Sequence, residues 1–69
     1  MRDWLLEERK RQNLTQLELS GKAGISRAYY AQIELMQRNP SIKIAKKLAN
    51  ALKVDWIRFY DDLRQDGIS

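Results

Sequence analysis

The stretch LTQLELSGKAGISRAYYAQIE, residues 14–34, decides the fold of this chain. Thr15 is followed three residues later by Glu18, which is the spacing of a capping box, in which each side chain binds a backbone N–H of the first helical turn. A helix over residues 16–23 is therefore predicted. Gly24 then suits the left-handed conformation in which helices often stop.

A second helix is predicted directly after this stop. Ile25 can plug the turn, and Ser26 is an N-cap candidate for a helix over residues 27–35. Two short helices separated by about three residues that include a glycine form a helix-turn-helix pattern. At roughly 100° per residue, Tyr30 and Ile33 lie on one face of the second helix, which we expect to be buried.

The other face of this second helix carries Arg27, Ala28, Ala31 and Gln32. Arg27 has a forked donor, the two alanines permit close approach, and the amide of Gln32 both donates and accepts hydrogen bonds. Such side chains have the chemistry that contacts base edges in a DNA major groove. The alternative interpretation is a solvated helix face that happens to contain Arg and Gln.

Three further helices complete an all-α domain. The first helix ends near Asn13, a residue that tolerates a left-handed terminus. Pro40 biases the residue before it away from helical angles, so a connection is expected there. Ser41 and Asp55 are N-cap candidates for the last two helices. The predicted single domain spans residues 1–69, with helices at about 3–12, 16–23, 27–35, 42–52 and 56–63.

The predicted helix over residues 42–52 is amphipathic. Its apolar residues form a regular stripe on one side: Ile44, Ala45, Leu48, Ala49 and Leu52. The other side is basic and includes Lys43, Lys46 and Lys47. We interpret these lysines as a solvated face with at most a long-range attraction for phosphate.

Charge is distributed unevenly along the chain. The 69 residues hold 13 Lys plus Arg against 9 Asp plus Glu, a net charge of +4. Residues 9–53 contain ten basic residues against two acidic ones, a balance of +8, whereas the two ends carry three basic and seven acidic residues, a balance of −4. A basic centre between acidic ends favours one face for a polyanion and other surfaces for something else.

The absence of cysteine and histidine excludes several kinds of chemistry. The chain cannot form a disulfide, a Cys/His zinc site or a cysteine nucleophile, and no histidine can activate a serine. We therefore expect no enzymatic activity, no cofactor and no metal. No apolar run approaches the roughly 18 residues of a membrane span, and the first residues lack a signal-peptide core, so a cytoplasmic protein is expected.

The order and spacing of these motifs are similar to those of the Cro/cI-type (Xre) helix-turn-helix regulators of phages and bacteria. The matching residues are Leu14, Thr15, Gln16, Leu19, Gly24, Ile25, Ser26, Arg27, Tyr30, Ile33, Glu34, Arg38, Asn39, Pro40, Ser41 and the stretch 45–52. The resemblance covers about residues 4–63. Several residues depart from the pattern: Glu8, Ser20, Ala23, Tyr30 and Met36, the last of which stands where Gly is usual. Gly21, beside Ser20, costs about 1 kcal/mol relative to Ala in a helix interior.

The resemblance implies a five-helix, lambda-repressor-like domain that binds operator DNA, with the 27–35 helix in the major groove, and acts as a repressor. The residues implied to contact bases are Arg27, Ala28 and Gln32. Those implied to contact the DNA backbone are Gln16, Ser26, Tyr29, Arg38 and Asn39. The resemblance also implies that Gln16 buttresses the base-contacting side chain. Arg9 and Glu34 match a structural ion pair between the first and third helices, with a phosphate contact as the alternative role for Arg9.

The last predicted helix carries more apolar side chains than one small core can cover. We expect Trp56, Phe59 and Leu63 to contribute in part to a homodimer interface, with burial in the core as the alternative. Two-fold symmetry would place two recognition helices about 34 Å apart and match a roughly palindromic operator. The alternative function, from another class, is an antitoxin or anti-repressor module that uses the same fold to bind a protein.

Overall fold

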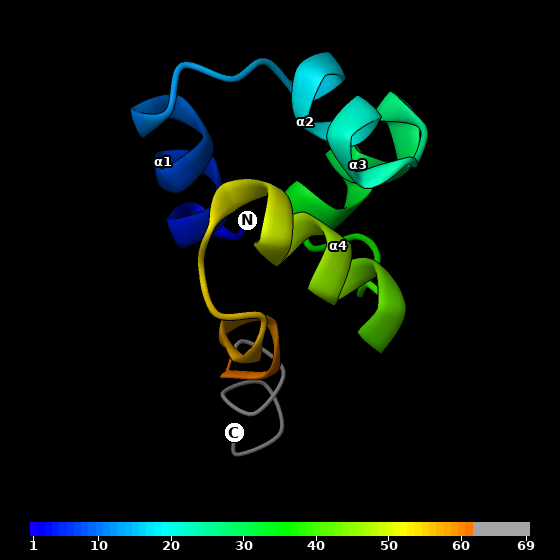
Figure 1. The fold of residues 1–69 in the computed structure, drawn as a ribbon. Coiled ribbons are helices and arrows are strands. Elements are labelled where there is room, and N and C mark those ends of the chain that lie inside the picture. The colour runs from blue at the N-terminus through cyan, green and yellow to red at the C-terminus, as the bar shows by residue number, and fades with distance from the viewer. Residues whose placement is uncertain (62–69) are drawn as a thin grey trace.

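Five helices make up residues 1–61, the part of the chain that the computed structural model describes. The first four are α1 (Asp3–Arg11), α2 (Gln16–Ala23), α3 (Arg27–Glu34) and α4 (Ile42–Leu52), and a short fifth helix spans residues 57–61. α2 and α3 lie against each other, and α4 runs past them toward α1 (Figure 1). No strand occurs among residues 1–61, so the predicted all-α, five-helix fold is confirmed. No helix in this range is long and apolar enough to cross a bilayer.

Side-chain caps set where the helices begin. Thr15 Oγ1 accepts a hydrogen bond from the N–H of Glu18 at 3.0 Å, and Glu18 Oε1 accepts one from the N–H of Thr15 at 2.9 Å. This is the predicted capping box, which satisfies donors that an α-helix start otherwise leaves unpaired. The other predicted caps accept similarly, at 3.1 Å for Ser26, 3.2 Å for Ser41 and 3.0 Å for Asp55.

Left-handed residues set where several helices end. Gly24 has φ 71°, as its place after α2 predicts, and Asn13 has φ 58° after α1. Met36 and Lys53 adopt the same conformation, at φ 65° and 59°, although neither has the conformational freedom of glycine. α1 and α3 each stop one residue before their predicted ends, because Gln12 and Leu35 are already the terminal caps.

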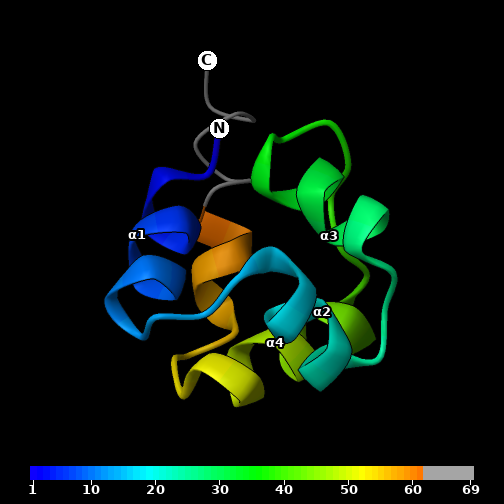
Figure 2. The same cartoon turned by 90° about the horizontal axis from the view of Figure 1, so that it is seen from above.

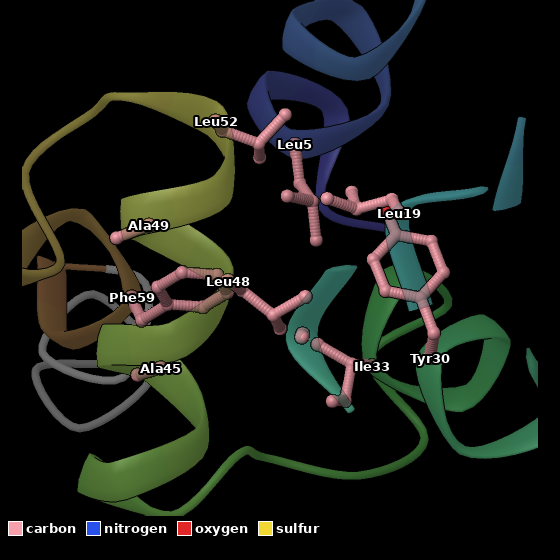
Figure 3. Packing of buried hydrophobic residues seen from close by; sticks show 10 residues of the cluster. Leu5, Leu19, Tyr30, Ile33, Ala45, Leu48, Ala49, Leu52 and Phe59 are labelled. Carbon is pink, nitrogen blue, oxygen red and sulfur yellow. The ribbon is translucent and has the colours of Figure 1, made fainter. Parts of the chain in front are cut away.

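The core lies where the four longer helices converge. Tyr30 and Ile33 of α3 are fully buried, as predicted, and face the leucines of the neighbouring helices (Figure 3). Ile25 is partly buried against this core, in agreement with its predicted role in the turn. The buried apolar residues are Leu5, Leu19, Ala23, Tyr30, Ile33, Ala45, Leu48, Ala49, Leu52 and Phe59.

The short fifth helix packs beside α1 (Figure 2). The ring of Phe59 meets that of Trp4 edge to face, with centroids 4.9 Å apart, and is only 2% exposed. The prediction that Phe59 forms a dimer interface is therefore corrected: its side chain belongs to the monomer core and presents no surface to a partner. Leu63, predicted for the same interface, lies outside the described residues. Ile57, which the sequence analysis did not single out, is 49% exposed.

Trp56 is only partly buried, and a lysine of α4 stacks on it. The ammonium of Lys46 lies 5.0 Å from the centroid of the Trp56 ring, a distance at which a cation is attracted to an aromatic face. Tyr60 meets the same ring edge to face at 5.1 Å. The interpretation of Lys46 as simply solvated is thus incomplete, because it helps hold the fifth helix against α4.

The two glycines of the helix-turn-helix give a matched test of backbone strain. A Cβ placed at Gly21 or at Gly24 would meet nothing within 4 Å. Gly21→Ala should stabilise the protein by about 0.5–1 kcal/mol, because alanine loses less conformational entropy in a helix. Gly24→Ala should destabilise it by about 1 kcal/mol, because φ is 71° there. Urea unfolding of both variants measures this, and shifts of the same sign would contradict the assignment.

Candidate nucleic-acid interface

The two faces of α3 are divided as the sequence predicts. Tyr30 and Ile33 are buried, whereas Arg27 and Ala28 are exposed and Gln32 is half-buried. The exposed face thus offers a guanidinium and a carboxamide, separated by side chains small enough for a close approach. This is the combination that contacts base edges in a major groove.

A buried carboxylate behind this face joins three helices. Glu34 of α3 is 3% exposed, and its two oxygens accept hydrogen bonds from one residue on each of α1, α2 and α3. Arg9 Nε donates to Oε2 at 2.8 Å and Arg9 Nη2 to Oε1 at 3.3 Å, which is a bidentate ion pair. Tyr30 Oη donates to Oε2 at 2.5 Å, and Gln16 Nε2 donates to Oε1 at 3.0 Å. The ion pair that the resemblance implies is therefore present, within a larger network.

The protonation of this network follows from its contacts. Burial by itself would raise the pKa of Glu34, but the hydrogen bonds from Arg9, Tyr30 and Gln16 outweigh it and hold the pKa below its usual range. Burial, together with the hydrogen bond to Glu34, raises the pKa of Tyr30. The hydrogen bond to Glu34 likewise raises the pKa of Arg9. At neutral pH the carboxylate is charged, and Tyr30 is a neutral donor.

Gln16 carries this network out to the exposed face of α3. Because its Nε2 donates to Glu34, its Oε1 is directed away from the carboxylate and accepts a hydrogen bond from Arg27 Nη1 at 3.3 Å. An amide can occupy either of two flipped orientations, and an acceptor-only carboxylate permits only the one seen here. The structure thus brings Gln16 and Arg27 together, as the buttress implied by the resemblance requires.

The remaining predicted DNA-contacting residues lie in α3, at its N-cap and in the connection that follows it. Tyr29 is half-buried within α3, and the Ser26 hydroxyl caps that helix, which leaves its own proton free to be donated elsewhere. Arg38 and Asn39 are exposed in the connection from α3 to α4. Asn39 Oδ1 accepts a hydrogen bond from Arg2 Nη2 at 2.7 Å.

Sequence reasoning missed two residues that support the interface. Tyr30 was placed in the core only as an apolar residue, although its spacing of four from Glu34 puts the two side chains on one helix face. Arg2 was counted only as part of the acidic ends, yet it is 1% exposed and contacts residues more than 30 positions away. The sequence held a local signal for Tyr30 but none for Arg2.

A helix-turn-helix family model, HTH_3, matches residues 5–59 of this chain. The chain belongs to the Xre-type helix-turn-helix family. The match includes α2, the turn and α3, together with both members of the Arg9–Glu34 pair. This Xre-type protein is accordingly a DNA-binding transcriptional regulator.

Two relatives show how far the likeness extends. The chain is 41% identical over 63 residues to an uncharacterized HTH-type transcriptional regulator, YqaF, of Bacillus subtilis, covering 91% of this chain and 83% of the relative. It is 44% identical over 46 residues to the immunity repressor protein of Bacillus phage phi105, covering 67% of this chain but 32% of that repressor. No solved structure matches the chain significantly.

The Tyr30 hydroxyl should stabilise this Xre-type protein through the charged form of Glu34. Tyr30→Phe removes one donor and should lower the free energy of unfolding at pH 7 by about 2 kcal/mol. The pKa of Glu34 is lower in the folded protein than in the unfolded chain, where it is about 4.3. The charged carboxylate therefore stabilises the folded protein above that pH, and this stabilisation is lost as the pH falls through the pKa of the folded state. The deficit should therefore shrink below about pH 4.3.

Urea unfolding followed by circular dichroism at a series of pH values measures this difference. Tyr60→Phe is the matched control, because the Tyr60 hydroxyl has no hydrogen-bond partner among residues 1–61 and its ring would be kept. The control should leave stability nearly unchanged. A deficit in Tyr30→Phe that persists undiminished in acid would show that the hydroxyl does not act through the carboxylate.

Proposed function

We propose that this chain is a transcriptional repressor that acts by occupying operator DNA, with α3 in the major groove. The observation that supports this most directly is the exposed base-contacting face of α3, on which Arg27 is held by Gln16 against a network anchored in the core. On a helix face that is merely solvated, the arginine would not need a link to the core. Here Arg27 is connected to the buried carboxylate of Glu34 through the amide of Gln16.

Bases are discriminated by two side chains. Arg27 presents a planar fork suited to the O6 and N7 acceptors of guanine, and Gln32 presents the donor and acceptor that match adenine. Ala28 lies between them and keeps the helix close to the base edges. Each good bidentate contact contributes about 1–3 kcal/mol of discrimination against a wrong base.

Contacts to the DNA backbone set the register of α3 in the groove. Ser26, Tyr29, Arg38 and Asn39 border the base-contacting face and supply hydroxyl, guanidinium and amide donors for phosphate oxygens. Gln16 has a second N–H on Nε2 beyond the one given to Glu34, and this proton is available to a phosphate. These contacts position the protein and carry no base preference of their own.

Operator occupancy is by a homodimer in this proposal. The interface is formed around the fifth helix by Trp56 and Ile57, which keep exposed apolar surface, together with Leu63. An interface related by two-fold symmetry pairs the same surface on both copies and matches a roughly palindromic site.

Substitutions of base-contacting and backbone-contacting residues should have different effects. Gln32→Ala should relax preference at particular operator positions, with about 1–3 kcal/mol of discrimination lost there. Arg38→Ala should weaken binding to all sequences and lower the slope of log affinity against log salt by about 1. Titrations of operator and random duplexes at several salt concentrations measure both. If the two variants lost specific and random binding alike, Gln32 would not contact bases.

Selection of bound fragments from a random duplex pool tests the dimer. The expected product is an inverted repeat whose half-site centres lie about ten base pairs apart, one helical turn. Ile57→Glu should place a charge in the interface and reduce selection to single half-sites, while leaving the base preference within each half-site unchanged. Recovery of no motif by the wild-type chain would overturn the regulator proposal, and an unchanged inverted repeat from Ile57→Glu would exclude this interface.

A further inference from the structure

The N-terminal Arg2 is tied to the end of the helix that carries the base-contacting face. Its backbone N–H donates to the carbonyl of Glu34 at 2.8 Å, and its Nε donates to the carbonyl of Ile33 at 3.0 Å. Its Nη2 reaches beyond the helix to Asn39 Oδ1 at 2.7 Å. At 1% exposure, Arg2 is the largest fully buried side chain among the described residues.

These bonds complete the C-terminal end of α3. An α-helix leaves its last four carbonyls without intrahelical partners, and here each of them accepts a hydrogen bond. Those of Ala31, Gln32 and Ile33 are bound by backbone N–H groups of Leu35, Met36, Gln37 and Arg38. The final carbonyl, that of Glu34, accepts from the backbone of Arg2. The guanidinium also places a positive charge at the negative end of the helix dipole.

The bond to Asn39 selects one orientation of its side-chain amide. Phosphate oxygens only accept hydrogen bonds, so an asparagine that contacts DNA backbone must present its N–H groups. Because Asn39 Oδ1 is held by a guanidinium, which only donates, Nδ2 is turned away from Arg2. Asn39 is exposed in the connection that follows α3, and its amide nitrogen is turned away from the buried guanidinium.

We propose that Arg2 is a positioning residue for DNA binding: it fixes the end of α3 and the connection that follows, and it turns the amide of Asn39 toward a backbone phosphate. This rests on the proposed function, since it assigns Arg2 a part in the same protein–DNA contact. Arg2 itself is buried and touches no DNA. Its effect reaches the phosphate through Asn39.

The test is a double-mutant cycle on DNA affinity. Arg2→Met keeps the aliphatic stem and removes the donors, and it should weaken binding to operator and random duplexes alike, by about three- to tenfold, the net range of one hydrogen bond. In an Asn39→Ala background, the same substitution should weaken binding clearly less than in the wild-type background, because the part of its effect that passes through the Asn39 amide is already gone. An equal loss in both backgrounds would overturn the proposal.

Arg58→Met is the matched control. Its guanidinium lies 4.5 Å from the Trp4 ring, so this change removes one positive charge and one cation–aromatic contact, as Arg2→Met does beside Phe59 at 5.7 Å. It touches neither α3 nor Asn39, and operator affinity should stay within about twofold, as expected for a rim charge. If both variants lost affinity equally, the effect would be one of charge or packing, and the proposal would fail.

Two further measurements keep the test decisive. Arg2→Lys keeps the charge but lacks the planar fork that spans Ile33 and Asn39, so it should lose DNA affinity in the wild-type background. Full affinity in this variant would overturn the proposal, and this holds even if Arg2→Met does not fold. In the protein without DNA, amide exchange at Gln37 and Arg38 should be faster in Arg2→Lys than in Arg58→Met, and equal exchange would overturn it. A wild-type chain that binds no duplex at low salt would instead overturn the proposed function, with faster exchange still supporting the positioning of the connection by Arg2.

Discussion

The buried carboxylate of Glu34 is the constraint on which the rest of the structure depends. Its negative charge lies within the protein, where an unpaired charge would cost several kcal/mol, so donors must converge on it. They come from three helices: Arg9 from α1, Gln16 from α2 and Tyr30 from α3. Satisfying this one group therefore fixes how α1 and α2 sit on α3. The packing of the helix-turn-helix and the pairing of the buried charge therefore depend on the same contacts.

Buried charges also orient the polar side chains at the surface. Glu34 accepts from the amide of Gln16 and turns the amide oxygen outward, while Arg2 donates to the amide of Asn39 and turns the nitrogen outward. An amide oriented in advance loses less side-chain freedom on binding, a cost of about 0.5–1.5 kcal/mol for each side chain that must be immobilised. The buried charges thus orient these two amides in the protein alone, which is what the proposed DNA contacts require.

The sequence predicted local structure well and long-range contacts poorly. The caps at Thr15, Ser26 and Ser41 and the stop at Gly24 depend on residues within one turn, and all occur as predicted. The face of α3 followed from helical periodicity, and the Arg9–Glu34 pair followed from the family resemblance. No local pattern indicates that the Arg2 side chain would bind the carbonyl of Ile33, because that contact depends on how α1 packs against α3.

The same limitation explains the error at Phe59. Periodicity showed that the last helix has apolar residues around most of its circumference, but only packing decides which of them the monomer covers. Trp4 and the guanidinium of Arg2 surround Phe59, whereas Ile57 is left exposed. Spacing alone could not show which of these apolar side chains the core of the monomer covers.

Under the proposed function, specificity and stability are carried by different residues of the same helix. Tyr30, Ile33 and Glu34 are buried and hold α3 in place, whereas Arg27, Ala28 and Gln32 add little to the core. Exposed substitutions away from structural contacts usually change stability by less than about 0.5 kcal/mol, so under the proposed function the base preference set at Ala28 can change with the fold intact. Arg27 differs, because its bond to Gln16 links it to Glu34. A new residue at position 27 must also satisfy the amide that the core presents, so the core restricts which base-contacting side chains fit there.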